Sequence, residues 1–218
     1  MMQFVEPSIE ETVDLNCDYP RVSERYFTEY FYVPSEKHKL EDRTKSEVSS
    51  AESNESVKKL SLDSVACDDK GSKDSFEHTC VLVHSNKLCL LSISHYHPII
   101  TGKKEVTKIS FDVGKFNRLE NQVSGKSKRG AQMFGPRSAV CIITCSDDSK
   151  YTVLSGVTGK LIEVNERLIA DPQLLTRSPK EDGYLAIVLP PLHNGDKAVS
   201  SLLSREQYEN LINSVVSS

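Results

Sequence analysis

A series of short apolar segments, which begins at residue 79 and continues almost to the C-terminus, most constrains the fold. The segments are rich in Val, Ile, Leu and Tyr, and turn-forming sequences such as HSN, TGK and SDDSK separate them. The strand candidates are TCVLVHS, LCLLSIS, KISFDV, AVCIITCS, YTVLSG, GKLIEV and GYLAIVLP. Many short strands at close spacing predict a mainly β domain, a small barrel or sandwich, over residues 79–218.

Two segments interrupt the β pattern and predict helices. NERLIADPQLL begins at Asn165, a good helix cap, and Pro172 breaks it. Near the C-terminus, Ser204 and Gln207 have the spacing of a capping box. Apolar residues follow at helical spacing, at Tyr208, Leu211, Ile212 and Val215. We expect this C-terminal helix to pack on the β-core.

A set of closely spaced aromatic residues marks the N-terminal segment, residues 1–34. Four aromatic residues stand at positions i, i+1, i+4 and i+5, namely Tyr26, Phe27, Tyr30 and Phe31. In a helix capped by Ser23 they would form one face, so we expect a short aromatic helix that packs in the core or docks on a partner.

Residues 35–78 have a different composition, with ten serines, one aromatic residue and dense charges of both signs. Such a segment cannot bury enough apolar surface to offset an ordering cost of roughly 1–2 kcal/mol per residue. We therefore predict a disordered, Ser-rich acidic insertion. Its serines beside acids, as in KKLSLDSV, are candidate phosphorylation sites, although any Ser-rich loop offers these by chance.

Charge is unevenly distributed along the chain, whose net charge is −4. Residues 79–218 hold 17 basic and 13 acidic residues, so this part is mildly basic and the N-terminal part is acidic. No apolar run approaches the ~18–20 residues needed to span a bilayer, and the N-terminus resembles neither a secretory signal nor a mitochondrial transit peptide. By elimination we expect a cytosolic or nuclear protein.

The cysteines and histidines carry no strong metal signal. Six cysteines occur, none at C-x-x-C spacing, and in a reducing compartment we interpret them as thiols. Cys141 and Cys145 would lie on one face of a strand, as small buried hydrophobes. His95 and His97 lack the further ligands that a metal site needs. No P-loop, G-x-G-x-x-G or Ser-His-Asp order is present, so we expect neither an enzyme nor a bound cofactor.

Three blocks between residues 151 and 212 resemble the glycine-cleavage H proteins, which are lipoyl carriers. These blocks are SGVTGKLIEVNERLIADPQLL, EDGYLAIVLP and SLLSREQYENLI, in the same order as in that family. The near-repeat of Val123-Ser-Gly-Lys126 and Val157-Thr-Gly-Lys160 also fits a pseudo-twofold β-structure. The resemblance implies a barrel-sandwich hybrid fold with short N-terminal and C-terminal helices.

The carrier function does not follow from this resemblance. H proteins place the lipoylated lysine at a hairpin tip, eleven residues before the glycine of the V-S-G motif. The matching residue here is Asp148, in the predicted hairpin loop Ser146–Lys150. Lys150 is two positions away and lacks the flanking sequence of the carriers, so we interpret it as a solvated turn lysine.

A second resemblance covers most of the chain outside residues 35–78. The matching segments are Arg25–Phe27, Thr79–Asn86, Val123–Ala131, Cys145–Asp147, Tyr151–Val153 and Glu163–Glu166, which are similar to the Abitram (Simiate, actin-binding transcription modulator) family. The resemblance implies a non-catalytic protein that binds monomeric and filamentous actin. It further implies residence in nuclear speckles and in the cytoplasm, including lamellipodia and growth cones. Residues 35–78 depart from the family, whose connection here is much shorter.

A basic cluster is the candidate partner-binding site. It comprises Lys115, Arg118, Lys126, Lys128 and Arg129, in or beside a glycine-bounded loop. Such a cluster would steer the chain toward an acidic protein surface such as that of actin. Two alternatives are a merely solvated loop and a nucleic-acid contact. Phe111, Phe116 and Phe134 could stack on bases, but burial in the core explains these residues better.

Overall fold

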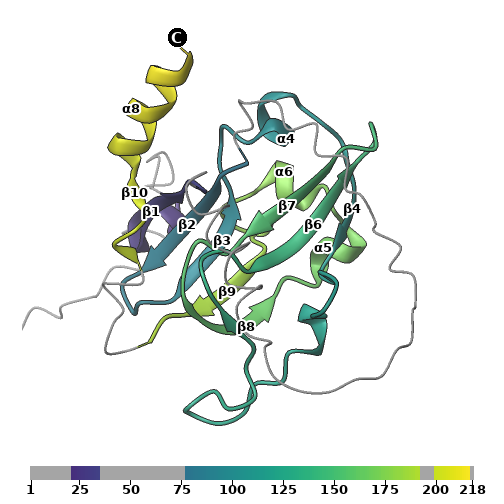
Figure 1. Ribbon diagram of the computed structural model, residues 1–218, viewed down its shortest axis with the longest axis vertical. Helices are drawn as coiled ribbons and strands as arrows, with labels where there is room; N and C mark the ends of the chain where they lie inside the picture. Colours follow the sequence, from purple (N-terminus) through teal and green to yellow (C-terminus); the bar gives the residue numbers. More distant parts are fainter. Residues whose placement is uncertain (1–20, 35–76, 192–198, 217–218) are drawn as a thin grey trace, which may run out of the picture.

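Strands dominate the computed structural model, which describes residues 21–34, 77–191 and 199–216 (Figure 1). The larger sheet has the strand order β10-β1-β2-β3-β9-β8-β5. Its strands are β1 (Phe27–Tyr32), β2 (Thr79–His84), β3 (Cys89–Ile93), β5 (Met133–Phe134), β8 (Gly159–Val164), β9 (Ala186–Leu189) and β10 (Leu203–Ser204). The smaller sheet has the order β4-β6-β7, formed by β4 (Val106–Ser110), β6 (Ala139–Cys145) and β7 (Lys150–Leu154). Neighbouring strands pair antiparallel, and the fold is the expected mainly β barrel-sandwich hybrid.

Residues of both sheets contribute to one main hydrophobic core. Side chains alternate along each strand, and in β7 Tyr151 and Val153 are buried whereas Lys150 and Thr152 are exposed. The two sheets bring together buried residues that include Val81, Leu91, Val188, Cys141, Ile143 and Val153. A fully buried aliphatic side chain contributes roughly 1.5–3 kcal/mol, so this core provides much of the driving force for folding.

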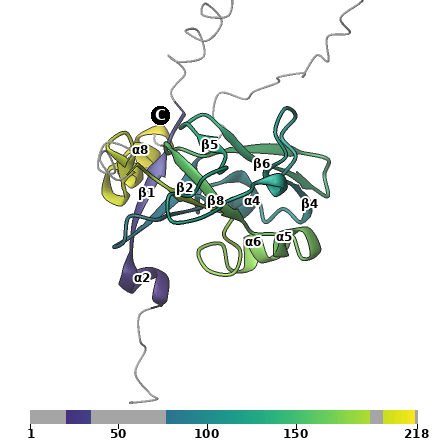
Figure 2. The ribbon, with the colours of Figure 1, turned by 90° about the horizontal axis from the view of Figure 1, so that it is seen from below.

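The C-terminal helix α8 (Arg205–Val216) packs beside β1, at the end of the molecule opposite to β4 (Figures 1 and 2). The predicted capping box is confirmed, because the Ser204 amide donates to Gln207 Oε1 (3.0 Å) and the Gln207 amide donates to Ser204 Oγ (3.3 Å). The buried Tyr208 ring stacks on Phe31, with 4.0 Å between the ring centroids. The helix therefore closes a second, smaller core.

The expected aromatic helix is wrong for most of its length. Helix α2 ends at Tyr26, and Phe27–Tyr32 forms β1, which pairs along its whole length with β2. A spacing of four is even and therefore also keeps residues on one face of a strand, which explains the error. The N-cap is Arg21, whose amide donates to Glu24 Oε2 (3.1 Å), rather than Ser23. The β-domain expected to begin at residue 79 thus also includes β1.

The second predicted helix is present as two short pieces, α5 (Arg167–Ala170) and α6 (Leu174–Arg177), with Pro172 between them. Asn165 does not cap α5, because Glu166 occupies that position. The buried Asn165 side chain instead donates to the carbonyl oxygens of Asp182 (2.7 Å) and Tyr184 (2.9 Å). The sequence did not predict two further short helices, α4 (Pro98–Thr101) and η2 (Arg118–Glu120).

Buried cysteines and histidines have structural roles. Cys141 and Cys145 are buried free thiols, as predicted, and so are Cys80 and Cys89. His97 caps α4 by accepting the Ile99 amide at Nδ1 (3.3 Å). Within the described ranges, no group of three or more His, Cys, Asp or Glu side chains could hold a metal ion.

The described ranges bear on two predictions, one about the insertion and one about membrane-spanning segments. Most of the predicted insertion, residues 35–78, lies outside them, although His78 at its end is buried and lies 2.9 Å from the Tyr208 hydroxyl. No helix in residues 21–34, 77–191 or 199–216 has the length and apolar character needed to cross a membrane.

Candidate protein-binding surface

The basic residues of the predicted cluster lie mainly on one loop, residues 122–131, which we call the basic loop. Ser124 and Arg129 pair across it through two backbone hydrogen bonds of 2.9 Å. The same tight turn carries Lys126 and Lys128, and both Lys126 and Arg129 are exposed. In Figure 1 this loop is teal and protrudes beyond β8. Three of the predicted cations are therefore brought together at one projecting point.

Left-handed backbone conformations shape the basic loop. They occur at Gly125 (φ 66°), Lys128 (φ 52°) and Gly130 (φ 80°). A Cβ atom on Gly130 would lie 2.5 Å from the Gln122 carbonyl oxygen, closer than real Cβ contacts. Glycine is therefore required at position 130 by both φ and space.

Arg118, which was predicted to belong to the surface cluster, is instead buried, with 4% of its surface exposed. Its Nε and Nη2 donate to the Ala139 carbonyl oxygen (3.1 and 2.8 Å), and its Nη1 donates to Gln132 Oε1 (2.7 Å). The guanidinium also lies 5.1 Å from the ring centroid of Phe116 and 4.7 Å from that of Phe134. Arg118 therefore holds the base of the basic loop and is a positioning residue rather than a contact residue.

Side-chain hydrogen bonds close both ends of the basic loop. The Gln132 amide donates to Asn121 Oδ1 (2.8 Å), which joins the residues on either side of the loop. Asn121 Nδ2 in turn donates to the Leu161 carbonyl oxygen in β8 (2.9 Å). Gln132 Nε2 donates to the Asn117 carbonyl oxygen (2.8 Å). These bonds fix the loop to the sheet, so its cations are presented on a preorganised backbone.

Two further lysines flank the basic loop. Lys115 is exposed on a neighbouring turn that the Asp112–Asn117 bridge closes. Lys160, which was not predicted, donates from Nζ to the Ser127 carbonyl oxygen (2.7 Å) and so supports the loop from β8. The repeated V-[ST]-G-K motif contained Lys160 and was the sequence signal that could have identified it.

The three phenylalanines near the cluster differ in exposure. Phe111 and Phe134 are buried, as predicted, with 1% and 2% of their surfaces exposed. Phe116 is 56% exposed, so the prediction that it lies in the core is wrong. Its ring rests on the Arg118 guanidinium, which the charge pattern of the sequence did not reveal.

The predicted hairpin connects β6 and β7, and its turn is acidic. At its tip Asp148 has a left-handed backbone (φ 60°), and its amide donates to the Cys145 carbonyl oxygen (3.1 Å). Lys150 is the first residue of β7 and pairs with Thr144 in the ladder. The apex therefore presents a carboxylate, and the lysine lies below it in the sheet.

One ion pair braces this tip. Lys104 Nζ donates to Asp147 Oδ2 (2.7 Å) and to Ser149 Oγ (3.1 Å), and it lies 5.2 Å from the ring centroid of Tyr151. The hydrogen bond from Lys104, followed by those from Ser149, holds the pKa of Asp147 well below its ordinary value. The same pair raises the pKa of Lys104. At neutral pH the Lys104–Asp147 pair is therefore ionised and closes the turn.

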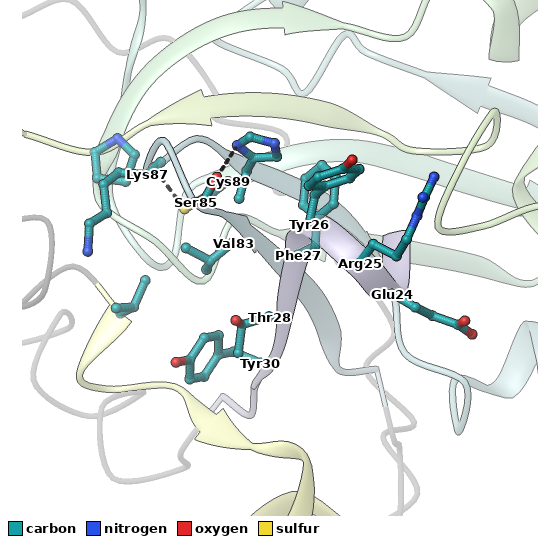
Figure 3. Close-up of a pocket in the computed structure, with 13 residues that line it drawn as sticks. Glu24, Arg25, Tyr26, Phe27, Thr28, Tyr30, Val83, Ser85, Lys87 and Cys89 are labelled. Carbon is teal, nitrogen blue, oxygen red and sulfur yellow. Dashed lines mark hydrogen bonds between the residues drawn. The ribbon is translucent and has the colours of Figure 1, made fainter. Parts of the chain in front are cut away.

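A pocket of about 490 Å³ opens where β1 begins beside the β2–β3 turn, and the sequence did not predict it (Figure 3). Its walls include the rings of Tyr26, Phe27 and His84, and the Phe27 and His84 centroids lie 4.9 Å apart. His84 Nδ1 accepts the Asn86 amide (3.1 Å) and so stabilises the β2–β3 turn. Nδ1 of His84 therefore takes part in a structural hydrogen bond within the turn.

The amino-acid sequence of this chain is similar to those of known proteins. The chain is 38% identical over 137 residues to Protein Abitram of Danio rerio, a match that covers 62% of this chain and 77% of that protein. Protein Abitram of Homo sapiens is 39% identical over 137 residues (62% and 76%), and that of Dictyostelium discoideum is 35% identical over 130 residues (60% and 71%). The chain belongs to the Abitram family.

This Abitram-family chain also matches the family model of the glycine cleavage H-protein at residues 144–215. A solved glycine cleavage system H protein from Mycobacterium marinum has a TM-score of 0.41, with 14% identity over 58% of this chain and 80% of that one. The family-model match begins at Thr144 and thus includes the hairpin tip described above.

A covalently held lipoyl group does not fit the apex of this hairpin. Such a group needs a lysine amine at the apex, where Asp148 stands here, and the exposed Lys150 lies two residues further along, in β7. Lys104, the other nearby amine, is occupied by Asp147 and Ser149. The region that matches the H-protein family model therefore has an acidic residue, Asp148, at the apex of its hairpin.

Proposed function

We propose that this Abitram-family protein is a non-catalytic binding protein that engages actin, as monomer and filament, through the basic loop. The observation that carries the proposal is the preorganised turn that projects Lys126, Lys128 and Arg129 together. An acidic protein surface such as that of actin is attracted to such a turn, and its rigid backbone lowers the entropy cost of binding. The apex of the β6–β7 hairpin supports a non-catalytic role, because Asp148 stands there in place of a carrier lysine.

Nucleic acid is the alternative partner of a basic loop. Single-stranded binding uses several exposed rings as stacking platforms, together with cations along the backbone. Of the three phenylalanines near the loop, Phe111 and Phe134 are buried and one face of Phe116 rests on Arg118. A protein partner is therefore favoured.

Co-sedimentation with filamentous actin tests the proposal. The triple variant K126E/K128E/R129E should lose most of its pelleting, because each substitution replaces an attraction by a repulsion. K108E is the matched control, since Lys108 is an exposed lysine on β4 outside the loop. Pelleting of the wild type should also weaken as salt rises. Unchanged pelleting of the triple variant would overturn the role of the loop, and a gel shift with single-stranded RNA at physiological salt would favour the alternative.

We further propose that the protein acts in both the nucleus, at speckles, and the cytoplasm, at actin-rich projections. A fluorescently tagged chain should be present in both compartments. The triple variant should lose its enrichment at projections while it remains present in both. Signal confined to a single compartment would contradict this part of the proposal.

A further inference from the structure

Exposed apolar side chains gather around the basic loop. In the described part of the chain, six large apolar side chains are exposed. Three of these lie between residues 116 and 133, namely Phe116 (56%), Leu119 (40%) and Met133 (58%). Single exposed apolar residues are ordinary, but half of the set lies on the two segments that lead into and out of the loop.

Met133 and the basic loop share one side of the sheet edge. Met133 pairs directly with Lys160 across β5 and β8, so their side chains project from the same face. The Lys160 ammonium reaches the Ser127 carbonyl oxygen at the turn of the loop (2.7 Å). Phe134, the next residue, points to the opposite face and is buried. Met133 therefore lies beside the cations and on the solvent side.

Lys115 and Phe116 form a second pair of a cation and an apolar side chain, like Lys160 and Met133. Lys115 and Phe116 are adjacent and both exposed, and the Phe116 ring lies on Arg118, which also binds Gln132, the residue before Met133. One buried guanidinium thus ties together the two segments that carry the exposed apolar residues. The surface consequently alternates cations and apolar side chains over a fixed base.

We propose that the basic loop and Met133 form one composite docking surface, and that its occupant is an acidic protein segment with an apolar side chain that packs on Met133. This inference rests on the proposed function and names the chemistry of the partner's contact segment. Charge complementarity identifies the acidic part of the occupant. The exposed methionine identifies the apolar part, because an unbranched thioether adapts to side chains of different shape.

The two parts of this surface respond differently to salt. Exposed charge pairs are screened beyond a Debye length of about 8 Å at physiological ionic strength. Burial of an apolar side chain is not screened. The cations therefore set the salt dependence of binding, whereas Met133 sets the affinity that remains at high salt.

Salt titration of actin binding separates the two contributions. M133S should weaken binding about tenfold at every salt concentration and leave the slope of affinity against salt unchanged. The triple variant K126E/K128E/R129E should flatten that slope. I169S is the matched control, because Ile169 is 51% exposed on α5 and lies outside this surface. Equal affinities of M133S, I169S and wild type would overturn the composite surface and leave the proposed function intact.

A direct probe tests the surface without actin. Two synthetic peptides of equal charge, each with four glutamates around a central Leu or a central Ser, are titrated into the isotope-labelled full chain and followed by NMR. The Leu peptide should shift the amides of residues 126–129, 133 and 160 and remain bound at high salt, where the Ser peptide is released. Equal behaviour of the two peptides would overturn the inference. Tight binding of a single-stranded oligonucleotide to the same amides, in place of the peptides, would also overturn it. Retained discrimination without any actin binding would instead remove actin as the partner.

Discussion

The hairpin tip and the basic loop are both tight turns that protrude from the β-scaffold, but they are held in different ways. At the tip, an ion pair whose side chains are 27% and 50% exposed, Lys104 and Asp147, braces an acidic turn. Under the basic loop, a buried guanidinium makes three hydrogen bonds between the loop base and β6. Water screens the first clamp and is excluded from the second. The loop, and not the tip, is thus the turn whose shape the fold fixes most firmly.

The largest expected difference between the hairpin and the basic loop is in how low pH affects their stability. Burial lowers the pKa of His97 and of His78 from 6.5 to about 4, and the nearby His78 adds to the lowering at His97. His97 packs edge-on against Tyr151 of the hairpin, with 5.1 Å between the ring centroids. Arg118 under the loop remains charged throughout this pH range. Protonation of His97 should therefore loosen the hairpin side before the basic loop, whereas protonation of His78 should loosen its contact with Tyr208 of α8.

The sign of this effect follows from proton binding. Between pH 6.5 and about 4 the unfolded chain binds more protons at these histidines than the folded chain, so stability falls as pH falls through this window. The loss amounts to about 3 kcal/mol or less for each histidine. Urea unfolding at a series of pH values measures it. H97N keeps an acceptor for the α4 cap but does not titrate, so it should flatten the profile. If the stability of H97N fell with pH as steeply as that of the wild type, groups other than His97 would cause the pH dependence.

The two clamps should also differ when each is removed. R118A leaves the Ala139 carbonyl oxygen and the Gln132 side chain without their charged donor, and it should lower the free energy of unfolding by about 3 kcal/mol. K104A removes an exposed pair and should have only a small effect. R118K, which cannot form the fork, should fall between wild type and R118A. Chemical denaturation with K108A as the surface control provides the measurement. Equal losses for R118A and K104A would remove the distinction between the two turns.

Sequence periodicity predicted the parts of this molecule that depend on local patterns. The strands from residue 79, the helix break at Pro172 and the capping box at Ser204 and Gln207 are all encoded within a few residues. The basic loop could be predicted as well, because the glycines and basic residues that define it all lie within residues 125–130. Local rules were sufficient where the deciding contacts are local.

The errors arose where distant contacts decide the outcome. Phe27–Tyr32 is a strand because it pairs with residues some fifty positions away, and an even spacing of aromatics fits both a strand and a helix. Arg118 is indistinguishable by charge from the lysines of the loop, and only its acceptors at Ala139 and Gln132 make it a buried residue. The composite surface was missed for the same reason, since Met133 meets Lys160 only through the pairing of β5 with β8.

The smallest expected effects come from substitutions at two residues with a left-handed backbone conformation, Gly130 and Asp148. G130A in the basic loop places a Cβ atom 2.5 Å from the Gln122 carbonyl oxygen at a φ of 80°, so it should cost about 2 kcal/mol. D148G at the hairpin tip relieves a left-handed non-glycine residue but adds backbone freedom to the unfolded chain, so stability should change by less than about 1 kcal/mol.

Thermal and urea unfolding of these two variants test the difference, and amide spectra show where each one acts. G130A should shift the amides of the basic loop and weaken actin binding, because the cations no longer share one turn. D148G should shift only the hairpin tip and leave binding at the wild-type value. If D148G weakened binding as much as G130A, the two turns would form one functional surface. The preorganised Arg118 clamp would then no longer explain why the partner is assigned to the loop.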